Sequence, residues 1–423
     1  MKNPSNETHG RRAIVERLGW SDALLAELVL PAGVMRLTCS LTSGLTRARH
    51  DPPDVFWGVG DRGPNIKPAA AVERYGLTQL ASHMAVDGAK IMPLPGEGPS
   101  LARFRIAGSQ IVLESHVRLT TPTGLALSGL PPPADPEHES EPALTLSGAP
   151  LGCDADGADT EGIAVLPDGR FWIAEEYVPS LLLVTRDGVA ERRIVPQGSA
   201  RFLGGSAIPV IEALPALAQS RKLNRGFEAL ALSPDGALLY VAFQSPLAHP
   251  DRLAHEQSDV VRIWALDARS GDLLQEFAYP LDAPELFRRD AGQGAVARRD
   301  IKVSELACLD DGSLLVLERA TLSTRIHRVW PVTAAALPAI MADPGHRPTL
   351  EQLGASGMLQ AGLPLLAKQL VLSTDDYPEI GGDLEGMIVL GPDTLLLAND
   401  SDYGTEGAET GFWKVTLPEP LTR

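Results

Sequence analysis

The sequence predicts an all-β fold, a single β-propeller built from four-stranded blades. A unit made of a glutamate, a short apolar strand, a turn and a second apolar strand recurs along the 423 residues, and its glutamates Glu161, Glu228, Glu305 and Glu385 are 67, 77 and 80 residues apart. A second hairpin-like stretch follows most copies, and two hairpins make one propeller blade. The 35 prolines and 40 glycines favour many turns and few long helices.

Five copies of the unit can be counted. The clear copies are EGIAVLPDGRFWIAEE from Glu161, FEALALSPDGALLYVAFQ from Phe227, SELACLDDGSLLVLER from Ser304 and LEGMIVLGPDTLLLANDSD from Leu384. A divergent copy, SGLTRARHDPPDVFWGVGDRG, starts at Ser43, and its second strand ends at Asp61. The turns carry PDG, DDG or GPD, which is tight hairpin chemistry. Five blades are therefore expected, and the divergent stretches leave room for a sixth.

The ring needs a closing strand because only GFWKVTL follows the last copy. We expect a strand within residues 24–41 to complete the last blade, which makes residues 1–423 one domain. Segments that do not repeat interrupt this domain at about residues 62–100, 131–158, 196–224, 281–300 and 332–366. The last of these has apolar residues at helical spacing, so we expect a small helical excursion there.

The composition excludes several classes of protein. With 37 basic and 54 acidic residues the formal net charge is −17, which opposes binding to nucleic acid or to an anionic membrane and suits cation binding. No apolar run is long enough for a signal-peptide core or a membrane span. As written, the sequence predicts a cytoplasmic protein; a periplasmic or secreted one is expected if the N-terminus has been trimmed. Cys39, Cys153 and Cys308 lack the spacing of a zinc site or a disulfide framework.

The repeat predicts that its acidic residues gather at one end of the propeller. In an antiparallel hairpin, the start of the first strand lies beside the end of the second. Each repeat carries polar side chains at one or both of these places. They are Glu161 with Glu175 and Glu176, Glu228 with Gln244, Glu305 with Glu318 and Arg319, Glu385 with Asn399 and Asp400, and Asp61 with Arg62. We therefore expect one polar channel mouth.

Several carboxylates at one mouth repel one another unless a cation, a proton or an arginine offsets their charge. Ligands with oxygen donors only suit Ca²⁺ best, with Mg²⁺ or Mn²⁺ as alternatives. We predict Glu161, Glu228, Glu385 and Asp400 as the metal ligands. The alternative is structural: glutamates at strand starts accept hydrogen bonds from backbone donors of the next blade, and acids at strand ends pair with Arg62 or Arg319.

The same mouth supplies candidate residues for catalysis and for binding an anion. Glu176 and Glu305 are the candidate general bases, and Asp61 is a third candidate catalytic carboxylate. The candidate anion-binding residues are Arg62, Arg319, Lys302 and Arg225. His327, the single histidine in a predicted strand, is interpreted as structural. No GxSxG, HExxH, P-loop or dinucleotide-binding motif occurs.

These residues resemble the esterase-like activity of phytase family of bacterial propeller proteins. The resemblance is carried by VGDRGPN (59–65), DTEGIAVLPDGRFWIAEEYVP (159–179), NRGFEALALSPDG (224–236), LLVLER (314–319) and DLEGMIVL with LLLANDSDYG (383–404). It implies a propeller and a phosphoester or ester hydrolase.

The sequence leaves three functions open. The first is a divalent-cation-dependent hydrolase of small anionic esters, in which the metal polarises the substrate oxygen or activates water. The second is a non-catalytic binding propeller stabilised by calcium. The third is a lactonase of the gluconolactonase-like type, whose neutral substrate would not need the arginines. The propeller fold by itself does not choose among them.

Overall fold

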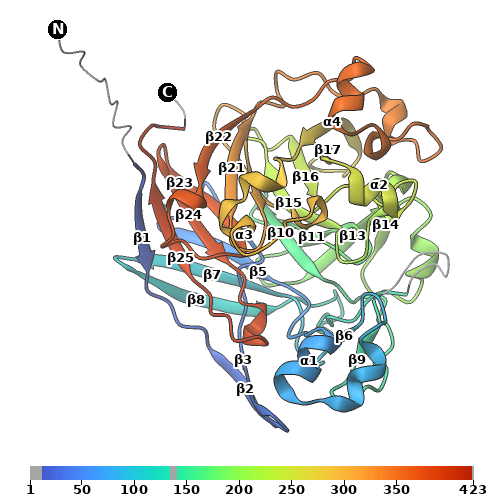
Figure 1. The fold of residues 1–423 in the computed structure, drawn as a ribbon, viewed down its shortest axis with the longest axis vertical. Helices are drawn as coiled ribbons and strands as arrows, with labels where there is room; N and C mark the ends of the chain where they lie inside the picture. The colour runs from blue at the N-terminus through green and yellow to red at the C-terminus, as the bar shows by residue number, and fades with distance from the viewer. Residues whose placement is uncertain (1–11, 134–140, 422–423) are drawn as a thin grey trace.

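The computed structural model describes residues 12–133 and 141–421 and confirms an all-β, five-bladed propeller (Figure 1). Blade 1 contains β4 (Gly44–Thr46), β5 (Val55–Gly60), β7 (Ser100–Ala107) and β8 (Gln110–Arg118). Blade 2 contains β10 (Thr160–Val165), β11 (Phe171–Glu175), β12 (Ser180–Val184), β13 (Ala190–Pro196) and a fifth, parallel strand, β14 (Val210–Leu214).

Blades 3 to 5 are four-stranded antiparallel sheets. Blade 3 contains β15 (Phe227–Leu232), β16 (Leu238–Phe243), β17 (Val260–Asp267) and β18 (Leu273–Pro280). Blade 4 contains β19 (Lys302–Cys308), β20 (Leu314–Arg319), β21 (Thr324–Val329) and β22 (Lys368–Ser373). Blade 5 contains β23 (Leu384–Gly391), β24 (Thr394–Asn399), β25 (Phe412–Thr416) and β1 (Ile14–Leu18).

An N-terminal strand closes the ring, but it is not the segment that the sequence predicted. The strand is β1, which pairs with β25 from Ile14 opposite Thr416 to Leu18 opposite Phe412, and Figure 1 shows it in blue beside the red strands of blade 5. Residues 24–41 were the wrong choice because they form a separate hairpin, β2 (Leu24–Leu30) with β3 (Gly33–Thr38). Met35 and Leu37 of that hairpin pack on α1 and its neighbours rather than on blade 5.

The hydrophobic cores lie between neighbouring blades. Aromatic rings seal the junction of blades 1 and 5, where Phe104 stacks on Phe56 at 5.0 Å between ring centroids and meets Phe412 at 5.9 Å. Trp20, just after β1, packs edge-on against both Phe104 and Phe412. Each such ring stabilises the fold by about 1.5–3 kcal/mol through burial alone, so the closing strand is held by packing as well as by its ladder.

Helical segments lie between strands, within single blades as well as between neighbouring blades. The α-helices are α1 (Pro68–Tyr75), α2 (Arg252–Gln257), α3 (Arg288–Ala291) and α4 (Leu350–Gln360). The 3-10 helices are η1 (Thr78–His83), η2 (Ala200–Phe202), η3 (Ala216–Ser220), η4 (Pro284–Leu286), η5 (Arg298–Asp300), η6 (Ala339–Ala342), η7 (Thr374–Asp376) and η8 (Asp402–Gly404). Among the described residues, no helix is long and apolar enough to cross a membrane.

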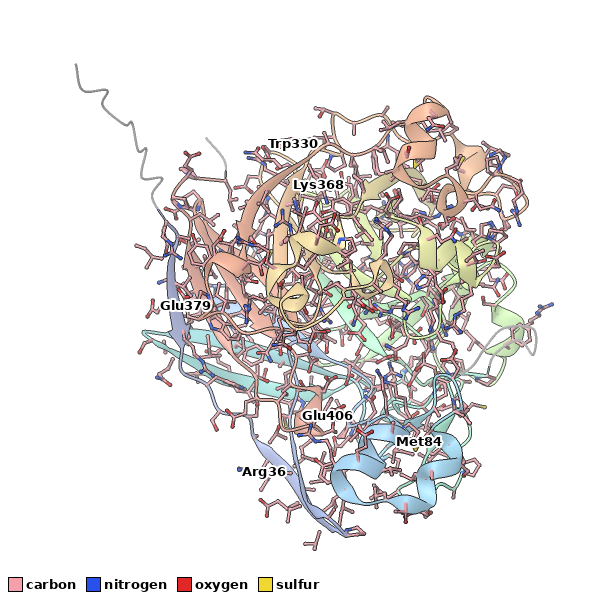
Figure 2. The ribbon with its side chains drawn as sticks, viewed as in Figure 1. Arg36, Met84, Trp330, Lys368, Glu379 and Glu406 are labelled. Carbon is pink, nitrogen blue, oxygen red and sulfur yellow. The ribbon has the colours of Figure 1, made fainter. Side chains whose placement is uncertain are left out.

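Two insertions form a lobe beside the propeller. The first contributes α1, η1 and β6 (Lys90–Ile91), the second contributes β9 (Ala143–Leu144), which pairs in parallel with β6, and Figure 1 shows the lobe below the blades. Residues 134–140, within the predicted insertion at 131–158, lie outside the described part of the chain. The lobe touches the segment after η8 where Arg74 pairs with Glu406 at 3.6 Å, and Figure 2 labels Glu406 at this junction. It therefore lies next to one end of the propeller axis.

Candidate functional site

The inner strands of four blades carry a bulge at the same place. In β10, β15, β19 and β23 the register with the second strand shifts directly after the first or second residue. The residues that follow the last regular pair before each shift are Glu161, Glu228, Ser304 and Glu385. A bulge re-aims the side chain it carries, so three glutamates and one serine hold equivalent positions at one end of the channel.

Glu305 is therefore not the fourth member of this set, and the predicted equivalence was wrong by one residue. It occupies the place of Gly162, where a Cβ atom would lie 2.5 Å from the carbonyl oxygen of Glu228 on the next inner strand. The Glu305 carboxylate accepts hydrogen bonds from the backbone N–H groups of Leu45 at 2.9 Å and Leu306 at 3.0 Å. Burial raises the pKa of Glu305, against these backbone donors. Through the bond to Leu45, the Glu305 carboxylate joins its own inner strand, β19, to the inner strand β4 of blade 1.

A cavity of about 280 Å³ lies at the channel mouth. The predicted residues that line it are Asp61, Arg62, Glu161, Lys302, Arg319, Glu385 and Asp400. Other lining residues include Asn65, Lys67 and Lys90, near or within the lobe, and Asn224, Gln244, Asp383 and Asp402 from the blades and their loops. Glu176, Glu228, Arg225 and Glu305 do not line it. The structure thus brings most of the predicted residues to one mouth of mixed charge.

Three acidic side chains of blade 2 form a tight group beside the cavity. Asp159, Glu161 and Glu176 each offer a carboxylate oxygen, and these oxygens lie within 4.8 Å of one another. Asp159 pairs with Arg62, and Glu176 accepts from Arg62 at 3.5 Å and from the backbone N–H of Gly226 at 3.2 Å. Among the described residues Glu161 has no hydrogen bond and no ion pair. Burial first, then the charge of Glu228 and its other acidic neighbours, raises the pKa of Glu161 well above its usual range.

The other three predicted metal ligands have partners of their own. Glu228 accepts from Gln244 Nε2 at 2.6 Å and from Ser304 Oγ at 3.4 Å. Glu385 pairs with Arg319. Asp400 accepts from Ser40 Oγ, Ser43 Oγ and, at 2.8 Å, the backbone N–H of Asp402. Within the described chain these three do not join Glu161 in a single ligand group.

Sequence reasoning missed Asp159, although a signal was present. Asp159 stands two residues before Glu161 in the DTEG segment, and side chains two residues apart in a strand face the same side. Glu141 was missed with no local signal, because it comes from a loop distant in the sequence and meets Arg62 at 2.7 Å only in the folded chain.

The four predicted cations fall into two pairs. Arg62 contacts Glu141, Asp159 and Glu176, donates to Asn224 at 2.7 Å, and lies 4.8 Å from the ring centroid of Tyr177. Arg319 donates to Ser304 at 2.8 Å and pairs with Asp383 and Glu385. Lys302 and Arg225, in contrast, have no side-chain hydrogen bond or ion pair within the described residues. The two arginines of the DRG and ER segments are thus engaged by protein acids.

Asp61 is a carboxyl group set apart from these ion pairs. It lines the cavity, and its Oδ1 accepts from the backbone N–H of Gly63 at 2.9 Å. Burial and the nearby charge of Asp400 raise the pKa of Asp61 to about 8, against the lowering effect of Arg62. A carboxyl group with a raised pKa is protonated over a wider range of pH than an exposed aspartate, as general acid catalysis near neutral pH requires.

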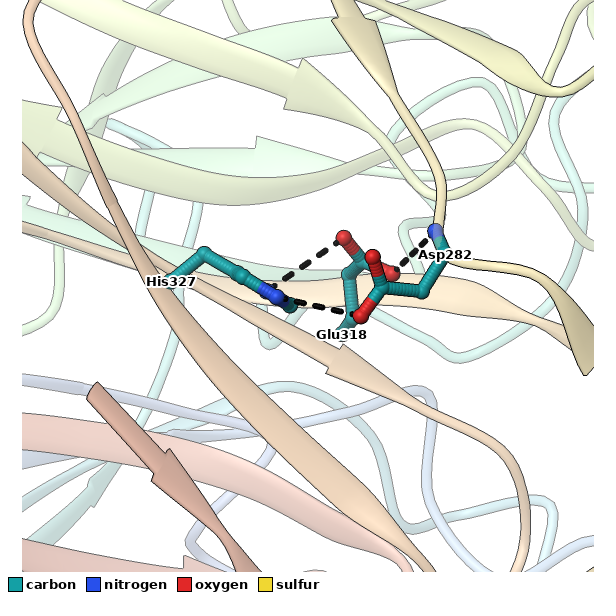
Figure 3. A group of neighbouring side chains, drawn as sticks. All are labelled: Asp282, Glu318 and His327. Atoms are coloured by element: carbon teal, nitrogen blue, oxygen red, sulfur yellow. Dashed lines mark hydrogen bonds and ion pairs between the residues drawn. The ribbon is translucent and has the colours of Figure 1, made fainter. Parts of the chain in front are cut away.

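A second group of possible metal-binding side chains lies in blade 4 (Figure 3). Figure 3 shows the ring of His327 directed at the carboxylates of Glu318 and Asp282, with His327 Nε2 3.0 Å from Asp282 Oδ2. Lys368 Nζ lies 2.7 Å from Asp282 and 2.5 Å from Glu318, and Arg325 also pairs with Asp282. Two cationic side chains already balance the two carboxylates. This group is therefore an ion-pair network, and His327 has the structural role predicted for it.

Comparisons with known proteins give one relative by sequence and several distant likenesses by structure. An "Uncharacterized secreted protein" of Arthroderma benhamiae is 28% identical over 217 residues, which are 46% of this chain and 40% of that protein. The chain therefore spans less than half of the relative's length. A luciferin-regenerating enzyme is 9% identical with a TM-score of 0.36, covering 96% of this chain and 95% of its own. A gluconolactonase from Xanthomonas campestris is 13% identical with a TM-score of 0.28, covering 75% and 69%.

A family model identifies the chain more directly. It matches residues 40–403, which reach from just before blade 1 into η8 and include every residue of the cavity except Thr405 and Glu406. The chain belongs to the phytase-like family described as "Esterase-like activity of phytase".

Proposed function

We propose that this protein is a divalent-cation-dependent hydrolase of small anionic esters, phosphoesters above all. The reaction takes place in the cavity at the channel mouth, the axial cavity. The observation that carries the proposal is Glu161. This carboxylate is half-buried at the cavity wall, has no partner among the described residues, and lies within 4.8 Å of the carboxylates of Asp159 and Glu176. A buried charge without a partner is costly, so a bound cation is the fitting complement.

The donor set suits a hard cation. Three carboxylates offer oxygen donors only, which favours Ca²⁺, Mg²⁺ or Mn²⁺ over zinc or copper. Arg62 supplies one positive charge to this group through Asp159 and Glu176, which leaves negative charge to be balanced. When bound, such an ion polarises an ester oxygen or lowers the pKa of a water molecule. Asp159, Glu161 and Glu176 would hold it.

The chain's own residues then have separate tasks. Asp61, with its pKa near 8, is the candidate general acid that protonates the leaving oxygen and later accepts a proton from water. Arg62 is a positioning residue, because its contacts go to Glu141, Asp159 and Glu176 and fix the orientation of two of the ligands.

The test measures hydrolysis of p-nitrophenyl phosphate and p-nitrophenyl acetate before and after chelation. We expect chelator to abolish hydrolysis and Ca²⁺, Mg²⁺ or Mn²⁺ to restore it. Glu161→Gln should lower kcat/KM by about 100-fold, equivalent to roughly 2.7 kcal/mol of transition-state stabilisation. Glu379→Gln, an exposed acid outside the cavity, is the matched control.

Three outcomes would contradict the proposal. Full activity in metal-free protein would exclude the cation. A chelator-induced fall in Tm with no turnover of any ester would identify a calcium-stabilised binding propeller. Turnover of a neutral sugar lactone without turnover of either ester would identify a lactonase.

A further inference from the structure

Lys302 is a cation in the axial cavity with no partner in the described chain. It begins β19 and pairs in register with Arg319 at the end of β20, so the two side chains share one face of blade 4. Like charges directly opposite each other destabilise a sheet. Arg319 is neutralised by Asp383 and Glu385, whereas no carboxylate of residues 12–133 and 141–421 lies within ion-pair distance of Lys302. Burial and the charges of Arg319 and Arg225 lower the pKa of Lys302 to about 8.

Arg225 is a second cation without a partner in the described chain, and its segment adjoins that of Lys302. The N–H of Gln244 donates to the carbonyl of Gly226 at 3.0 Å, and the carbonyl of Gln244 accepts from the N–H of Val303 at 2.8 Å. Arg225 stands two residues before β15, and its Nη1 atom is buried without a hydrogen bond. Burial lowers the pKa of Arg225, Glu176 and Glu228 oppose that shift, and Arg319 adds to it. These acids act at longer range, because neither lies within ion-pair distance of the guanidinium among the described residues. Two half-buried cations thus lie on neighbouring segments of blades 3 and 4, and Lys302 lines the cavity.

The acidic partners of Arg62 and Arg319 argue against assigning these two arginines to the binding of the substrate anion. A guanidinium that binds a ligand anion needs free donors in its planar fork. Arg62 is engaged by Glu141, Asp159 and Glu176, and Arg319 by Ser304, Asp383 and Glu385. An anion would have to displace those acids to reach either arginine, whereas Lys302 and Arg225 would gain their first partner.

We propose that Lys302 and Arg225 form a phosphate-binding subsite, separate from the carboxylate group of blade 2, and that this subsite holds the anionic group of the substrate. The subsite rests on the proposed function for its role in turnover, but anion binding itself requires neither metal nor reaction. Lys302 lines the same cavity as Glu161, and Arg225 is within electrostatic range of Glu176. A phosphoester bound there would share the cavity with Glu161.

The test is calorimetric titration of metal-free, full-length protein with inorganic phosphate in the presence of chelator. We expect saturable binding of one phosphate. Lys302→Met and Arg225→Met should each raise Kd by about tenfold or more, and Arg225→Lys should recover part of the loss. Lys67→Met is the matched control, because Lys67 is an exposed cation on the same cavity rim and should change Kd by less than about twofold.

A second measurement needs no variant. An amine-reactive acetylating reagent should modify Lys302 in the wild-type protein, and phosphate should protect that lysine more than Lys67 when the peptides are quantified. Absence of phosphate binding to wild-type protein, or unchanged Kd in both folded Met variants, would overturn the proposal. Binding of malonate but not of phosphate would also overturn it and would identify a carboxylate subsite. Chelator is present throughout, so failure of the metal proposal leaves these outcomes unaffected.

Discussion

Side chains of one chemical type have different roles in this molecule according to their partners. Glu161 and Glu305 are both carboxylates on inner strands, yet Glu161 is half-buried at the cavity without a partner in the described chain, and Glu305 is buried and accepts two backbone N–H groups. Arg62 and Lys302 differ in the same way, because three acids engage Arg62 and no acid of the described chain engages Lys302. The residue types predicted that polar side chains gather at one channel mouth. Only the hydrogen-bond and ion-pair partners of each side chain separate candidate ligand-binding residues from structural ones.

Replacing Glu305 tests its structural role. Glu305→Ala leaves the N–H groups of Leu45 and Leu306 buried without an acceptor, which should lower the free energy of unfolding by about 1–3 kcal/mol. Glu305→Gln keeps one carbonyl acceptor and should cost less. Urea unfolding measures both. If Glu305→Ala were as stable as the wild type but inactive in ester hydrolysis, Glu305 would belong to the reaction and not to the scaffold.

At the scale of strands, the repeat predicted where each inner strand begins, but not the register of that strand with the second strand of its blade. The SEL segment places a glutamate one residue later than the EG and FEA segments, and the bulge in β19 assigns the equivalent position to Ser304. A one-residue offset in a strand changes the face that a side chain occupies. Sequence spacing could not settle this, because a bulge adds a residue that no composition signal marks. The closing strand β1 was missed because its short IVERL segment is mostly solvent-exposed.

Ser304→Glu tests the equivalence of the bulge positions. Glutamate already occupies this position in three blades, so the backbone should accept it with little change in Tm. The new carboxylate would lie beside Arg319, whose Nε now donates to Ser304 Oγ, and on the same blade as Lys302. We expect it to occupy the anion subsite and to abolish phosphate binding in calorimetric titration. Unchanged phosphate affinity would show that the inserted carboxylate does not reach Lys302, and would count against this geometry.

For the whole molecule, the propeller gathers acids at one end, and this concentration makes stability depend on pH. Burial and Asp400 raise the pKa of Asp61 to about 8, and burial and Glu176 raise the pKa of Glu228 to about 7. Carboxyl groups with raised pKa values bind more protons in the folded chain than in the unfolded one. Their contribution to stability is complete below their usual pKa and is lost as pH rises through the folded pKa values.

The Tm of metal-free protein should therefore fall between about pH 4 and pH 8, with each such proton contributing a slope of at most about 1.4 kcal/mol per pH unit. Asp61→Asn should flatten part of this fall, and saturating Ca²⁺ or Mn²⁺ should oppose it. Thermal unfolding in chelator at several pH values measures the effect. A Tm that is constant or rises over this range would show that the acids at the mouth are balanced without a cation.

The central claim is that Asp159, Glu161 and Glu176 hold a divalent cation. The most direct measurement is anomalous diffraction from crystals of the wild-type protein and of Glu161→Gln grown or soaked with Mn²⁺. We predict an anomalous peak bonded to carboxylate oxygens of all three residues in the wild type, and its loss in the variant. A wild-type crystal with no peak at these carboxylates, or with its peak elsewhere, would contradict the account.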